Sequence, residues 1–258
     1  RTGSSMFNFN SSAAPTDGIF QVSPTKGRLL IDKFKLTTSG WKPIERVTTL
    51  EYRFGVVDPS DSHQDIIYLN SFSASTTLNT SLPVRGNNVT VVVECRSASG
   101  HAQQLTMPVT VEEVTSLVLS DFVEKGNETL QTASNAQFES EFTIICSAIP
   151  SIIQTLNSSH QGSTLISSLV DTMTARKDDL SVEIQVQSTK LLSNEIQLFD
   201  KRSVLQLSHL LTDVMKEQNA SQVLSDAISA TSNFAAVLIG EKSETSEKLA
   251  FIELLDQV

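Results

Sequence analysis

The spacing of apolar residues changes once along this chain, and that change limits the fold more than any other feature of its 258 residues. Up to about residue 113, short segments alternate apolar and polar residues, at the two-residue period of a β-strand. Beyond it, apolar residues recur every three or four positions, as in an amphipathic helix. Strands followed by helices are typical of an α+β protein, built as one unit or as separate domains.

The first part predicts six short strands separated by turn signals. Phe34, Leu36 and Thr38 share one strand face, and Leu50, Tyr52 and Phe54 share another. Strands that recur every ten to fifteen residues predict a β-sandwich over residues 17–113, with a turn over residues 24–27. The predicted strands lie within 18–24, 31–38, 48–55, 65–70, 88–97 and 104–112.

The second part predicts helices joined by short polar links. The first ends or kinks at Pro150, and Asp200 can cap the third. Residues 181–187 alternate like a strand, so either state remains open for them. Because each helix has one apolar stripe to bury, we expect an antiparallel helical layer or bundle. The predicted helices lie within 136–149, 163–173, 200–215, 221–240 and 243–258.

Charge divides the chain at the same place. The net charge of −10 comes entirely from residues 114–258, which also contain only one of the seven prolines. An acidic second half argues against nucleic-acid binding. We therefore predict an α+β multidomain chain with separate cores: a linker or tail (1–16), the sandwich (17–113), a linker (114–126) and a Ser-rich helical region (127–258).

Residues that could support catalysis or metal binding are sparse. The four histidines are far apart, and the sequence has neither a phosphate-binding loop nor a nucleophile elbow. Asp58, Asp61 and Asp65 could surround a calcium ion, although they also suit an ordinary turn. A secreted hydrolase or lectin would need a pocket of converging polar groups, which no motif indicates. We expect no enzyme activity, no cofactor and no metal.

The segment Ser208–Thr212, "SHLLT", is similar to the His-Leu-Ser/Thr site at which autoproteolytic receptor stalks cleave themselves. Leu211 stands in place of the nucleophile, and the segment has the pattern of a helix interior. We therefore expect no self-cleavage here.

Cysteines and glycosylation sequons bear on the compartment. Cys95 and Cys146 lie in different regions and are expected to be buried and unpaired, so they do not identify the redox environment. The number of Asn-x-Ser/Thr sequons exceeds what the composition predicts, which favours a secreted or cell-surface glycoprotein. The sequons begin at Asn10, Asn79, Asn88, Asn127, Asn157 and Asn219.

One stretch, Phe20–Phe54, resembles the receptor-for-egg-jelly region of polycystin-1-like proteins. That region has a V-x-P-x-x-G turn, an F-x-L strand, a Gly-Trp pair and an L-x-Y-x-F strand. In the family, cysteines that can pair often stand beside the first motif and before the Gly-Trp, whereas this chain has Ile19 or Phe20 and Thr38 there. The matching residues are Val22, Pro24, Gly27, Phe34, Leu36, Gly40, Trp41, Leu50, Tyr52 and Phe54.

The resemblance implies a fibronectin type III-like or immunoglobulin-like sandwich, followed by a REJ-type helical region that could lead to a stalk domain. It also implies a non-enzymatic extracellular interaction module of a ciliary or cell-surface membrane glycoprotein. Its partners would be proteins, either a polycystin-2-type channel or an extracellular filament protein. We expect any membrane anchor to lie outside these residues.

The alternative is a structural component of a secreted assembly, such as a flagellar hair (mastigoneme) or coat. On either interpretation, Trp41 is expected to close one end of the sandwich rather than to bind a ligand.

Overall fold

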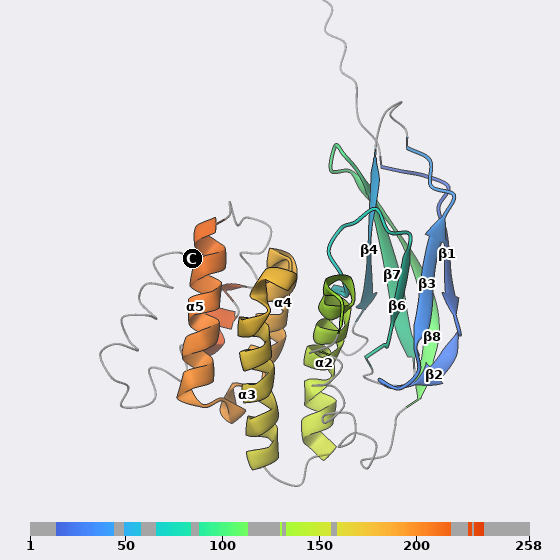
Figure 1. Cartoon of the computed structure of the whole chain (residues 1–258). Coiled ribbons are helices and arrows are strands. Elements are labelled where there is room, and N and C mark those ends of the chain that lie inside the picture. Colours follow the sequence, from blue (N-terminus) through green and yellow to red (C-terminus); the bar gives the residue numbers. More distant parts are fainter. Residues whose placement is uncertain are drawn as a thin grey trace, which may run out of the picture.

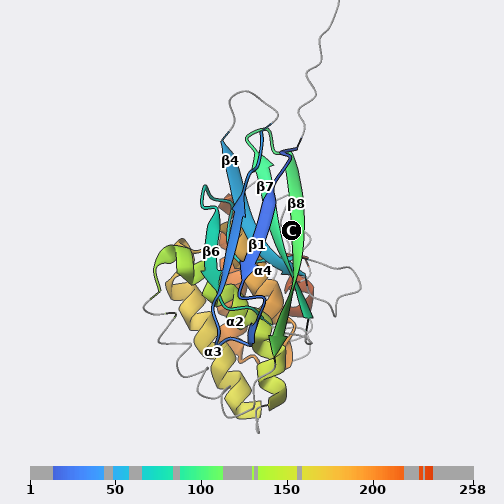
Figure 2. The same cartoon turned by 90° about the vertical axis from the view of Figure 1, so that its right-hand side faces the viewer.

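The computed structural model describes residues 14–43, 49–57, 66–83, 88–112, 130, 133–155, 159–217, 227–228 and 230–234. Two β-sheets form from the first part of the chain, and helices form from the second, so the fold is α+β (Figure 1). The helices lie along one side of the sheets, next to β4, β5 and β6 (Figures 1 and 2).

The two sheets differ in size. Antiparallel strands β1, β3 and β6 form the smaller sheet in the order β1-β3-β6. The larger has the order β2-β8-β7-β4-β5 and is antiparallel except for the β2–β8 pair. The strands are β1 (Ile19–Ser23), β2 (Lys26–Arg28), β3 (Phe34–Ser39), β4 (Leu50–Val57), β5 (Ile66–Tyr68), β6 (Thr77–Thr80), β7 (Asn88–Ser97) and β8 (Ala102–Glu112).

The inner faces of both sheets contribute alternate apolar side chains to a shared core. Phe34 and Leu36 of β3 are fully buried, and Phe54 of β4 is 1% exposed. The ring of Phe20 on β1 lies 6.3 Å from that of Phe54, centroid to centroid, so the two sheets meet through these side chains. The alternation in the sequence therefore identifies the inner faces correctly.

The helices also pair in a definite order. Helix α4 packs against both α2 and α5, and α3 packs against α5. The helices are α2 (Asn135–Thr155), α3 (Ser159–Ala175), α4 (Val182–Ser193) and α5 (Lys201–Glu217), with 3-10 turns at Lys177–Asp179 and Ile196–Leu198. Residues 227–228 and 230–234 are helical as well.

Local structure differs from the sequence-based expectation in three places. Strand β2 begins at Lys26, within the predicted turn, because it pairs with β8. Helix α2 continues through Pro150 to Thr155 instead of ending there. The open segment 181–187 is helical, since Ser181 caps α4 by accepting a hydrogen bond from the Ile184 N–H, 3.4 Å away.

The expectation of separate cores is wrong. The buried apolar side chains of the sheets and the helices form one continuous cluster, which extends from Val22 to Phe234. The strands nevertheless end at Glu112 and the long helices begin at Asn135, so the change of period marks the change of structure. That the predicted domains fold independently of each other stays a prediction.

Asp200 caps α5 and allows a first test. Its carboxylate accepts a hydrogen bond from the Ser203 N–H (2.7 Å) and another from the Ser167 hydroxyl (3.3 Å). Burial alone would raise the pKa of Asp200, but these hydrogen bonds and nearby Arg202 lower it overall. A lowered pKa means that the charged form stabilises the fold above the unfolded pKa, and that this stabilisation disappears as pH falls through the folded pKa.

We expect Asp200→Ala to lower the free energy of unfolding by about 1 kcal/mol at pH 7, the usual effect of losing a helix cap. Urea unfolding followed by circular dichroism measures it. The difference from the wild type should narrow below about pH 4, where the Asp carboxylate titrates. Asp200→Asn is the matched control, because asparagine also caps helices and should cost little. An equal loss in both variants would contradict the capping role.

Candidate functional site

Charged side chains gather on the outer face of the larger sheet, where α4 approaches it. Strand β4 contains Glu51 and Arg53 at alternate positions, and β7 contains Glu94 and Arg96. Antiparallel pairing places Arg53 opposite Glu94 and Glu51 opposite Arg96. Each strand thus supplies the charge that complements the other, and opposite charges directly across a ladder stabilise the pairing.

Arg53 is the most enclosed of these cations, with a side chain that is 13% exposed. Its Nε and Nη2 atoms donate to Glu94 Oε2 at 3.2 and 3.1 Å, and Nη1 donates to Glu183 Oε2 of α4 at 3.1 Å. Its guanidinium also stacks over the rings of Tyr68 (3.4 Å to the centroid) and Phe72 (4.2 Å). Arg53 therefore links two strands, the segment after β5 and a helix.

Glu94 receives hydrogen bonds from several directions on one oxygen. Besides Arg53, the Tyr68 hydroxyl donates to Oε2 at 2.6 Å and Gln104 Nε2 donates at 3.2 Å. Burial, together with the hydrogen bond to Glu94, raises the pKa of Tyr68, so its hydroxyl remains a donor across the physiological range. We call Arg53, Tyr68, Phe72, Glu94, Arg96, Glu183 and Gln187 the junction cluster.

Two helix side chains, Gln187 and Glu139, form hydrogen bonds to the edge strand of the larger sheet and to the segment after it. The Tyr68 N–H donates to Gln187 Oε1 (3.0 Å), and Gln187 Nε2 donates to the Tyr68 carbonyl (2.9 Å). An amide side chain of α4 thus satisfies the outward backbone groups of the edge strand β5. Buried Glu139 of α2 accepts from the N–H and hydroxyl of Ser71 (both 3.0 Å) and from the Ser181 N–H (2.7 Å).

A cavity of about 360 Å³ lies beside the junction cluster. Polar groups do converge there, but most of them bond to one another: Arg53 to two carboxylates, Tyr68 to Glu94, and Gln187 to the strand backbone. The described lining has neither a cysteine nor a histidine that could act as a nucleophile or a general base. The arrangement suits holding helix against sheet more than a chemical reaction.

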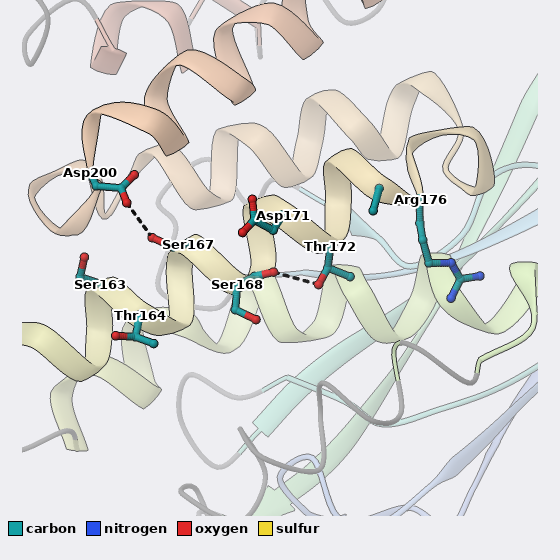
Figure 3. A pocket seen from close by; sticks show the side chains of 9 residues that line it. Ser163, Thr164, Ser167, Ser168, Asp171, Thr172, Arg176 and Asp200 are labelled. Carbon is teal, nitrogen blue, oxygen red and sulfur yellow. Dashed lines mark hydrogen bonds between the residues drawn. The ribbon is translucent and has the colours of Figure 1, made fainter.

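A wider groove of about 700 Å³ follows the Ser- and Thr-rich face of α3 (Figure 3). Most of its polar groups are also engaged. The Thr172 hydroxyl donates to the Ser168 carbonyl (2.8 Å), and Asp171 accepts from Arg202 and Gln206 of α5 at 3.0 and 2.9 Å. The two bonds to Asp171 join α3 to α5. The groove is lined by Ser163, Thr164, Ser167, Ser168, Asp171, Thr172, Ala175, Arg176 and Asp200.

Trp41 lies at the edge of the core, 9% exposed. Its indole N–H donates to Thr38 Oγ1 at 2.5 Å, and the Thr38 hydroxyl donates to the Ile19 carbonyl at 3.1 Å. The Gly18 backbone lies flat against the indole, since a Cβ there would sit 2.3 Å from the ring. Gly40 has a φ of +74°, which favours glycine. These contacts hold the indole between the Gly18 backbone and Thr38.

The positions where the resemblance implies paired cysteines are neighbours here too. Phe20 and Thr38 are direct partners in the β1–β3 ladder. Phe20 packs against Phe54, and Thr38 accepts the Trp41 N–H. Packing and a hydrogen bond therefore occupy the place of a covalent link.

The other sequence candidates are scattered. Cys95 and Cys146 are buried and unpaired, and burial raises the pKa of the Cys95 thiol to about 12, so neither is poised to react. Ser208–Thr212 lies in the middle of α5, as predicted. Among the described residues no group of His, Cys, Asp or Glu could hold a metal ion. His63, Asp58, Asp61 and Asp65 lie outside the described residues.

The sequons are only partly visible. Asn79 is exposed on β6, at the edge of the smaller sheet, and Asn88 is exposed at the start of β7. The remaining four, Asn10, Asn127, Asn157 and Asn219, lie outside the described residues. Glycosylation therefore stays a prediction.

The sequence reasoning missed the junction cluster. A usable signal was present, because both predicted strands contain a Glu-x-Arg pattern on the face opposite the apolar residues. The helix residues Glu183 and Gln187 give no such signal, since the pattern of residues 181–187 fits a strand as well as a helix.

Two sheets with an apolar core, backed by helices and joined to them by structural polar contacts, define an α+β module. A family model described as the REJ domain matches residues 1–145, more than half of the chain. The chain therefore belongs to the REJ family, as the resemblance implies. No curated protein matches the chain.

The family sets the coarse function. REJ domains are non-catalytic modules of polycystin-type proteins and are typically extracellular there. Within the described ranges, every helix is too short or too polar to span a bilayer.

Proposed function

We propose that this chain is a non-enzymatic extracellular interaction module of a polycystin-like ciliary or cell-surface membrane glycoprotein. The match of the REJ family to residues 1–145 carries the proposal. The excess of sequons supports it, because Asn-x-Ser/Thr acceptors are used on the secretory route. The polar groups that line the cavity and the groove mostly bond to one another, which favours a structural role for both over catalysis.

The architecture we propose is a fibronectin type III-like sandwich braced by an antiparallel helical layer. The sandwich is supported by the two sheets, which share one core. One sheet has three strands, and the other contains the long strands β4, β7 and β8. The helix pairs α2–α4, α4–α5 and α3–α5 support the layer. The partners would be proteins, with a polycystin-2-type channel as the first candidate.

The test is the location of the chain in the organism that expresses it. Antibodies against residues 14–112 should label intact, non-permeabilised cells at the surface or the cilium, and the signal should stay with the membrane fraction. Mass spectrometry of intact peptides from the same material should find glycans at Asn88 and Asn219. Labelling only after permeabilisation, with every sequon bare, would refute an extracellular location. Co-purification with a filament that lacks membrane would favour the hair or coat component.

A further inference from the structure

Strand β8 has an unpaired edge on the side of the larger sheet opposite the helices (Figure 1). Strand β2 pairs only with Thr110–Glu112, so among the described strands the stretch from Ala102 to Pro108 forms a ladder with β7 alone. Strand β1 of the smaller sheet lies close to β8 but forms no ladder with it. An unpaired edge of this length is a template for another strand.

The direction of each backbone group on that edge follows from the register. The Thr110 N–H donates to the Thr25 carbonyl (3.0 Å), away from β7. In an antiparallel strand alternate residues point the same way, so the backbone N–H and C=O groups of Gln104 and Thr106 also point away from β7. Pro108 belongs to the same alternate set, so its backbone nitrogen also points away from β7. Its lack of an N–H therefore costs the β7–β8 ladder no hydrogen bond.

These outward groups have few partners among the described residues. There, the Gln104 carbonyl accepts a hydrogen bond from the exposed Gln103 side chain, at 3.3 Å. No hydrogen bond of the Thr106 N–H or carbonyl to another described residue is present. At the same edge, Leu105 and Met107 are only partly buried, although both pack against the core. A further strand at this edge would pair with the outward backbone groups of Gln104 and Thr106 and would cover the side chains of Leu105 and Met107.

We propose that this edge pairs, antiparallel, with the same edge of a second copy of the chain. Residues 102–111 contain no charged side chain, so two copies can meet there without like-charge repulsion, despite a net charge of −10 for each. A two-fold axis at Leu105 pairs Gln104 with Thr106 of the second copy, and Thr106 with its Gln104. The Ala102 N–H then meets the Pro108 carbonyl, so the missing Pro108 donor falls at the two ends of the ladder.

The proposal does not depend on the proposed function, because it rests on the register of β8. One short ladder buries little surface, so we expect a weak, reversible dimer. Sedimentation velocity of the 258-residue chain, from about 5 µM to about 500 µM, covers the range in which such contacts associate.

Thr106→Pro is the decisive variant. It removes the outward N–H and should leave the β7–β8 ladder intact, as Pro108 does two residues along. By symmetry the variant lacks two intermolecular hydrogen bonds, and we expect the dissociation constant of the dimer to rise at least about tenfold. Thr106→Val keeps the N–H and is the matched control, expected to dimerise like the wild type.

Each other outcome counts against the proposal. A wild-type chain that stays monomeric throughout the concentration range would overturn it. A dimer that Thr106→Pro leaves unchanged would show that another surface is responsible. Loss of the far-ultraviolet circular dichroism spectrum in Thr106→Pro would contradict the outward direction of this N–H.

Discussion

Replacing Trp41 with alanine should lower the free energy of unfolding by about 3–5 kcal/mol, the usual cost of removing a large buried aromatic side chain. The indole is 9% exposed, contacts the Gly18 backbone and donates to Thr38. Its loss leaves a cavity that the ladder between β1 and β3 prevents from collapsing. Urea unfolding followed by circular dichroism is the measurement, since Trp41 is the only tryptophan and the variant has no tryptophan fluorescence.

Trp41→Phe separates packing from hydrogen bonding. Phenylalanine keeps most of the apolar contact but loses the N–H that Thr38 accepts, which is typically worth about 0.5–1.5 kcal/mol. Its destabilisation should therefore lie well below that of Trp41→Ala. An alanine variant as stable as the wild type, but deficient in binding a partner, would show that the indole serves recognition.

Gly18 offers an independent check of the same packing. A Cβ at this position would meet the Trp41 ring at 2.3 Å, which is closer than real contacts allow. The need for glycine here was not evident from the sequence, because residue 18 lies at the start of the first predicted strand and the indole that it contacts is 23 positions further along the chain. What the sequence did indicate was the burial of Trp41, from its place between two strands.

The alternation of apolar and polar residues predicted those strands well that have one apolar face and one polar face. Phe34, Leu36 and Thr38 alternate with exposed or half-buried residues, as the pattern indicates. Strand β6 was missed because Thr77–Thr80 contains a single large apolar residue, Leu78, and owes its conformation to pairing with β3. A strand that forms mainly because it pairs with a neighbouring strand has only a weak apolar pattern in its own sequence.

Segment 181–187 shows the opposite case. Val182, Ile184 and Val186 alternate as in a strand, yet the segment is the start of α4. The buried face continues beyond it through Ser188, Thr189 and Leu192, at helical spacing, and the serine and threonine among them were not counted as apolar. Small hydroxyl-bearing residues can be buried in a helix when they donate to a carbonyl one turn earlier, as Thr189 does to Gln185 (2.8 Å).

The contact between helices and sheets could not be predicted from either part alone. Each strand shows a Glu-x-Arg pattern, but the partner of Arg53 on α4, Glu183, is 130 residues away. Buried Glu139 and Glu141 of α2 likewise meet Ser71 and Lys33 of the first part. The net charge of the second part gives no sign that these two glutamates are buried and face the sheets.

Breaking the buried Arg53–Glu94 pair should be the other large effect. The Arg53 side chain is 13% exposed, and Glu94→Leu leaves it with Glu183 as its one carboxylate partner among the described residues. The same change deprives the Tyr68 hydroxyl of its acceptor. Removing one member of a buried ion pair typically costs about 3–5 kcal/mol, because the remaining charge stays desolvated. We expect that loss for Glu94→Leu and a comparable one for Arg53→Met, measured by urea unfolding.

The double variant Arg53→Met with Glu94→Leu should be more stable than either single variant, since two apolar side chains can replace a buried pair at little cost. The coupling energy from this cycle should exceed about 1 kcal/mol. The neighbouring pair, Glu51 and Arg96, is the matched control, because it joins the same two strands but its side chains are 42% and 37% exposed. Its cycle should give at most about 1 kcal/mol, since water screens exposed charges. Equal coupling in both cycles would mean that burial against α4 does not strengthen the Arg53–Glu94 pair.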